Sequence, residues 1–223
     1  MIAVIGEILP LALVVTISPI NIIAEILLLF SSKPVANASS YLVGFVTGVT
    51  VVLGAFVAIA GAVDLSPGSD PSKGAAALKL VLGVALLVAA VRKFRGRPRS
   101  DEEASMPKWM DGITGFAPGR SLAVGVAIGA LNPKNLAVGL ASALSIAAAD
   151  LTTGQRLGSM AVYVFVAVLG VATPLVMTLV LGARANEVLE GWKTWLGRNN
   201  AVVMTVLFLV FGVVLVGQGV AAL

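Results

Sequence analysis

The chain of 223 residues contains no cysteine and no histidine, and few of its residues carry a charge. Without cysteine it cannot form disulfides, thiolate metal sites or a thiol nucleophile. Without histidine it lacks the most common metal ligand and the usual proton shuttle near neutral pH. Since the sequence also has no nucleotide-binding loop, we expect neither an enzyme nor a bound cofactor or metal.

Charged residues make up 12% of the chain, whereas hydrophobic residues make up 58%. A soluble domain has about 25% charged and about 45–50% apolar residues, so this composition is typical of a protein within a bilayer. A membrane-crossing helix needs about 20 apolar residues. We therefore predict an all-α integral membrane protein with six spans, at 2–30, 40–63, 75–91, 121–149, 157–181 and 200–222.

Basic residues lie mostly in alternate connections between these spans. The first, third and fifth connections contain Lys33, Arg92, Lys93, Arg95, Arg97, Arg99, Lys108, Arg120, Arg184, Lys193 and Arg198. The opposite side has only Lys73, Lys79 and Arg156. Because short basic loops stay in the cytoplasm, we expect both termini to lie outside a bacterial plasma membrane.

The basic segment at 92–99 divides the chain into halves of three spans each. We predict a first three-helix repeat at 1–91, a cytoplasmic linker with a short interfacial helix at 92–120, and a second repeat at 121–223. Since three is an odd number, the second half crosses the membrane in the opposite sense. Amphipathic segments at 107–113 and 184–198 contain all three tryptophans, which predicts two surface helices at the cytoplasmic boundary.

Two short polar motifs occupy matching places in the first and fourth spans. The first comprises Ser18, Pro19, Ile20 and Asn21, and the second comprises Asn132, Pro133, Lys134 and Asn135. Proline removes a hydrogen bond from the helix, and within a bilayer the freed carbonyl must find another partner. We therefore predict a 3+3 inverted repeat whose first and fourth helices are broken or kinked near Pro19 and Pro133, with a substrate path at the breaks. The plainer alternative is that the prolines only kink these helices while the asparagines cap the broken ends.

Lys134 is the most informative residue of the second motif. A lysine at this depth is costly, so we expect it to face a polar cavity, where it could bind an anionic headgroup or carry a proton. Glu25, in the cytoplasmic half of the first span, is its natural partner and the other candidate for proton coupling. A structural role for Lys134, paired with a helix C-terminus or a carboxylate, is the alternative. The predicted translocation path comprises Ser18, Pro19, Asn21, Glu25, Asn132, Pro133, Lys134 and Asn135.

Two pairs of glycines are spaced four residues apart, Gly44 with Gly48 and Gly125 with Gly129. Such pairs let helices approach closely. We expect them to pack spans within one chain, with dimerisation as the second possibility.

The segments 17–23 and 27–31 resemble the start of the GAP/Sap family, and Leu131 to Leu136 resembles a second-half motif of the LysE (lysine exporter) superfamily. The segment 195–201 also fits. The resemblance implies a glycolipid- or sulfolipid-addressing membrane protein of actinobacteria. Export is then expected, of envelope glycolipids in the family and of small solutes in the superfamily. Many lysine-exporter relatives have a proline-glycine-proline type motif in the first span, whereas Ile20 and Asn21 follow Pro19 here, which disfavours amino-acid substrates.

The leading hypothesis is a secondary exporter that moves an envelope glycolipid or related amphiphile outward between the two halves, with proton coupling as an option. A proton-coupled exporter of a small polar solute, either an amino acid or an ion, is the first alternative. A non-transporting scaffold for a lipid-synthesis complex is the second. The expected partners are membrane lipids, a glycolipid substrate, lipid-biosynthesis proteins and a second copy of the chain, with no nucleic acid.

Overall fold

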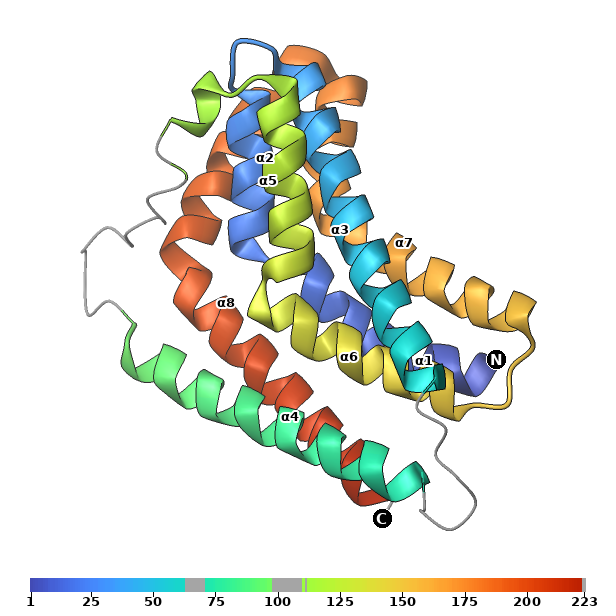
Figure 1. Cartoon of the computed structure of the whole chain (residues 1–223). Coiled ribbons are helices and arrows are strands. Elements are labelled where there is room, and N and C mark those ends of the chain that lie inside the picture. Colours follow the sequence, from blue (N-terminus) through green and yellow to red (C-terminus); the bar gives the residue numbers. More distant parts are fainter. Residues whose placement is uncertain (63–70, 98–109, 111, 222–223) are drawn as a thin grey trace.

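The computed structural model describes residues 1–62, 71–97, 110 and 112–221, and every regular element within these ranges is a helix (Figure 1). The elements are α1 (Ile2–Thr16), α2 (Pro19–Leu29), α3 (Pro34–Ala62), α4 (Pro71–Arg95), η2 (Ile113–Gly115), α5 (Pro118–Leu131), α6 (Pro133–Ala148), α7 (Thr153–Leu181), η3 (Gly182–Arg184) and α8 (Ala185–Ala221).

Proline sets the start of five helices, namely α2, α3, α4, α5 and α6. The first helical position suits proline because its missing N–H would have no partner there and its fixed φ already matches the helix. α7 begins differently, with a capping box in which Thr152 and Gln155 exchange side-chain and backbone hydrogen bonds. This box starts α7 four residues before the predicted boundary at 157, since two otherwise orphaned N–H groups find partners there.

The predicted breaks in the first and fourth spans are confirmed. α1 and α2 meet at an angle of 51°, and α5 and α6 meet at an angle of 57°. Pro19 and Pro133 stand at the first position of the second helix in each pair. Each bent pair continues from one end of the molecule to the other, so both pairs are bent helices and neither turns back on itself (Figure 1).

Tight helix crossings hold the fold together. α3 lies along α5 and also touches α6, α7 lies along α1 and also touches α2, and α4 lies along α8. At the α3–α5 crossing, a methyl group added to Gly44, Gly48, Gly125 or Gly129 would overlap the backbone of the facing helix. The predicted use of these glycines in packing within one chain is therefore confirmed.

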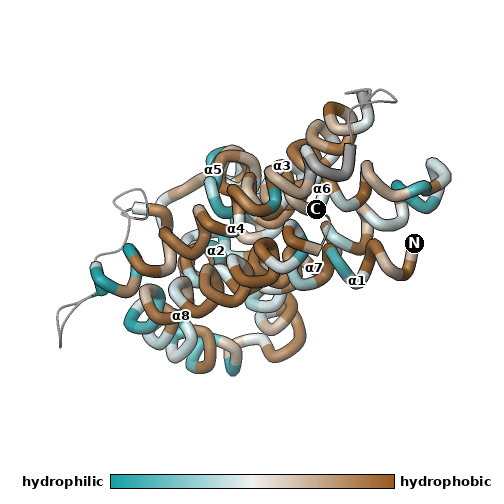
Figure 2. Tube along the Cα trace, turned by 90° about the horizontal axis from the view of Figure 1, so that it is seen from below, coloured by the Kyte–Doolittle hydropathy of each residue, from teal (hydrophilic) through white to brown (hydrophobic). Residues whose placement is uncertain are grey.

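The outward faces of the long helices are apolar, as contact with lipid requires. Large exposed hydrophobic side chains follow α3, α4, α7 and α8, among them Val51, Val81, Phe165 and Leu209. Figure 2 shows hydrophobic residues dominating along most of the helical tubes. Among the described residues, two helical stretches, Pro34–Gly61 and Thr153–Ala221, are long and apolar enough to cross a membrane, and the number rises to four if each bent pair counts as one span.

The C-terminal part of the chain differs from the prediction. We expected a surface helix at 184–198 and a separate span from 200, but α8 runs without interruption over 37 residues. No proline interrupts this stretch, and the Asn199 amide donates to the Trp195 carbonyl within the helix (2.8 Å). Trp192 and Trp195 are exposed on the first part of α8. Of the other expected surface helix, residues 107–109 and 111 lie outside the described ranges, and the short helix η2 follows them.

Candidate functional site

The second break satisfies its own backbone. Pro133 has no N–H for the Gly129 carbonyl, which lies one turn earlier. The Asn135 side-chain amide turns back and donates to the carbonyls of Ile128 (3.2 Å) and Gly129 (3.5 Å). The Asn132 side chain caps α6 by accepting the Lys134 backbone N–H (3.1 Å). Both asparagines therefore have the capping role that the plainer alternative assigned to them.

Lys134 joins the two breaks. Its Nζ donates to the Val14 carbonyl (2.7 Å) near the C-terminus of α1, and the side chain is buried. The last carbonyls of a helix lack partners and carry partial negative charge, so a cation is favoured there. The start of α6 is thereby linked to the end of α1. The expected pair with Glu25 is not formed, since neither carboxyl oxygen of Glu25 has a partner among the described residues. Lys134 instead has the helix C-terminus as its partner, as the structural alternative proposed.

The first break is not satisfied in the same way. Ser18 stands at the N-cap of α2, but its side chain makes no capping hydrogen bond. Asn21 is fully buried, and neither its amide nitrogen nor its amide oxygen has a partner among the described residues. Its backbone carbonyl accepts from the Tyr41 hydroxyl of α3 (3.5 Å). Although Asn21 and Asn135 match in sequence, only Asn135 closes its own break.

Glu25 lies one turn after Asn21 on the same face of α2. Its side chain is fully buried, and neither carboxyl oxygen has a hydrogen-bond partner among the described residues. An isolated carboxylate in such surroundings is very costly, whereas the neutral acid is much less so. The two breaks therefore differ. Hydrogen bonds of the Asn132 and Asn135 side chains close the second, whereas the side chains of Asn21 and of Glu25, one turn beyond the first motif, have no partner among the described residues.

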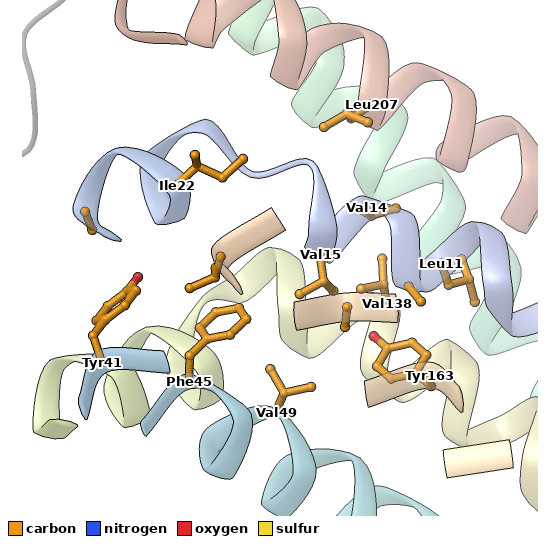
Figure 3. Packing of buried hydrophobic residues seen from close by; sticks show 14 of the residues in the cluster. Leu11, Val14, Val15, Ile22, Tyr41, Phe45, Val49, Val138, Tyr163 and Leu207 are labelled. Carbon is orange, nitrogen blue, oxygen red and sulfur yellow. The ribbon is translucent and has the colours of Figure 1, made fainter. Parts of the chain in front are cut away.

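A small cavity of about 10 Å³ lies beside the breaks. Residues of α1, α3, α5, α6 and α7 line it, including Tyr163 and Asn135, whose Oδ1 has no hydrogen-bond partner within the part of the chain that the structure describes. Figure 3 shows Tyr163 near Val15, Val49 and Val138 in this part of the core. A cavity of this size has room for about one water molecule. A solute larger than that can enter this cavity only if the helices that line it separate.

Sequence reasoning missed Tyr41 and the Val14 carbonyl. The chain has only two tyrosines, Tyr41 and Tyr163, and both are fully buried. A tyrosine within an apolar span usually finds a hydrogen-bond partner for its hydroxyl. With only two tyrosines in the sequence, both could have been named as candidate polar groups of the core. The Val14 carbonyl carried no such indication, because every residue has a carbonyl and only the fold leaves this one near an amine.

The apolar outward faces, the candidate spans and the two bent helices define an all-helical membrane protein with a polar centre. The chain belongs to the SfLAP family, described as Sap, sulfolipid-1-addressing protein, whose family model matches residues 8–221. No curated protein and no solved structure matches it. The suspected Sap relationship is thus confirmed, while placement in the LysE superfamily stays a prediction. The family description points to lipid addressing and not to catalysis.

Proposed function

We propose that this protein exports an envelope glycolipid or a related anionic amphiphile, moving it outward past the two helix breaks. The observation that carries the proposal is the link between Lys134 and the Val14 carbonyl, which ties the broken ends of the two halves together. Membership of a family described as sulfolipid-1-addressing supports a lipid as the cargo.

An inverted repeat would supply the required motion. In our proposal each bent pair counts as one span, so the chain has six spans in two halves of opposite orientation. The exchange of partners between the halves supports this view: α3 of the first half packs against α5 and α6, and α7 of the second half packs against α1 and α2. Transporters of this kind move one repeat against the other around a site at the midplane. In the proposal both termini lie outside, because the connections with most of the basic residues are expected to lie in the cytoplasm.

Lys134 has a specific role in this scheme. Its ammonium group now has a backbone carbonyl as acceptor, and an anionic headgroup offers stronger acceptors of the same kind. When the halves separate, the headgroup would take the place of the Val14 carbonyl. Asn132, Asn135, Asn21 and Ser18 would provide further donors and acceptors along the path.

The test is a paired profile of surface-exposed lipids and of culture-medium metabolites, with and without the gene. Export predicts a lipid that is synthesised but fails to reach the surface. Complementation with Lys134→Met should restore little of that lipid, because the replacement has similar volume but no charge. Lys79→Met is the matched control, since Lys79 is also largely buried but pairs with Glu7 away from the breaks (3.5 Å).

Other outcomes would reject the proposal in favour of the alternatives. Unchanged surface lipids, with a solute missing from the medium, would indicate a small-solute exporter. Full activity of folded Lys134→Met, together with loss of activity on altering residues 92–120, would indicate a scaffold for lipid-synthesis proteins.

A further inference from the structure

The unpaired groups on α2 form a compact cluster. The Asn21 amide and the Glu25 carboxyl lie one helical turn apart, both fully buried, and the Tyr41 hydroxyl approaches the Asn21 carbonyl from α3. Four side-chain atoms of this cluster have no partner among the described residues, namely Nδ2 and Oδ1 of Asn21 and Oε1 and Oε2 of Glu25. Native interiors leave few such atoms unpaired, and each one calls for an explanation.

We propose that this cluster is an occluded proton-binding site, in which Glu25 holds the exchangeable proton and Asn21 and Tyr41 stabilise the carboxylate after the proton has left. The inference deepens the proposed function, on which its role as the coupling site rests. It separates the proton carrier, Glu25, from the residue proposed to meet the headgroup, Lys134.

Space and solvation favour a proton over a metal cation. All four unpaired atoms are buried from water among the described residues, so a hydrated metal ion would have no room beside them unless the helices moved. A proton requires no added volume. It also removes the charge of the carboxylate, which is the largest cost of burying this group without a partner.

The neighbouring elements supply no counter-charge to Glu25 among the described residues. On α3 the adjacent titratable group is Tyr41, and η2 has none over Ile113–Gly115. On α8, Lys193 pairs with Glu190 (2.6 Å) and lies above the Phe30 ring, beyond the end of α2. Glu187 and Arg198 of α8 are exposed. On α7, Tyr163 lines the small cavity, and Arg156 lies beside Gly61 at the far end of α3.

The same residues explain how the proton could leave. Ionised Glu25 needs donors, and within one turn the Asn21 amide offers two N–H groups. The Tyr41 hydroxyl, now bonded to the Asn21 carbonyl, is a third donor once α2 shifts relative to α3. Water admitted by that shift would accept the proton on the side to which α2 opens.

The test is infrared spectroscopy of the purified protein in detergent or lipid nanodiscs, at neutral pH, in sodium-containing and in choline-containing buffer. We expect the carbonyl-stretch band of a protonated carboxylic acid, equal in both buffers, and unshifted by the cation. The band should disappear in Glu25→Gln and remain in Glu7→Gln, because Glu7 is half-exposed and pairs with Lys79. Size-exclusion chromatography and circular dichroism would verify that each variant is folded.

Three results would overturn the inference: no protonated band in the wild type, a band unchanged in Glu25→Gln, or a band that appears only when sodium is removed. If Glu25→Gln does not fold, Glu25→Asp keeps the test decisive, since it retains the acid but must shift the band. The measurement needs no lipid substrate, so its failure is distinct from a failure of lipid export.

Discussion

Replacing Gly125 by alanine should weaken the α3–α5 crossing. An added Cβ would overlap the Tyr41 carbonyl and would lie 2.9 Å from the Phe45 backbone nitrogen, where real Cβ contacts are seldom below 3.4 Å. The obstacle is backbone on the facing helix, so no side chain can rotate away. The two helices would have to separate along their contact.

The expected loss follows from two opposing terms. Overpacking of a well-filled core costs about 1–3 kcal/mol, and a backbone obstacle favours the upper end of that range. Alanine also favours the helix over glycine by about 1 kcal/mol. The net destabilisation is then about 2 kcal/mol, which lowers the melting temperature of a chain of this size by about 4–8 °C.

The assay is thermal unfolding of the purified protein in detergent, followed by circular dichroism. Gly139→Ala is the matched control, since Gly139 is also a buried helical glycine but a Cβ there would meet no heavy atom within 4 Å. The control should be as stable as the wild type or up to about 1 kcal/mol more stable. Equal stability of Gly125→Ala and wild type would refute the packing argument.

Further predictions concern the second break and the outer ion pair. Asn135→Leu removes the donor from the carbonyls of Ile128 and Gly129, and since these would be left unsatisfied we expect a loss of about 1–3 kcal/mol in the same unfolding assay. An unchanged melting temperature would show that other donors close this break. Glu7→Gln breaks the 3.5 Å pair with Lys79, but the half-exposed carboxylate limits the loss to below about 1 kcal/mol, and unfolding at low and high salt should differ little. A loss well above that value would mean that the pair is shielded from solvent.

Much of the fold could be predicted from local chemistry. The bent pair of α1 and α2 covers 2–29 where the sequence predicted a span at 2–30, and α7 ends at the predicted residue 181. Hydrophobic length and proline act within a few residues, so the sequence displays them directly. The breaks at Pro19 and Pro133 follow from the same local cause, the missing N–H of proline.

The candidate site could be predicted only in its composition. Asn21, Glu25, Asn135 and Lys134 are all buried near the breaks or on the helices that follow them, as polar residues inside a span should be. The sequence alone does not show which of these side chains find hydrogen-bond partners. Asn135 turns back to carbonyls six and seven residues away, whereas the matching Asn21 has no side-chain partner among the described residues.

By itself, then, the sequence determined where most of the helices lie, where two of them break and which polar residues they bury, because these properties depend on neighbours along the chain. Only the tertiary structure decided that Lys134 bonds to the Val14 carbonyl, 120 residues away, and that the Glu25 carboxyl has no partner among the described residues. Those outcomes depend on how helices from opposite halves dock. A hydrogen bond forms only when packing brings donor and acceptor within about 3 Å, whatever their spacing in the sequence.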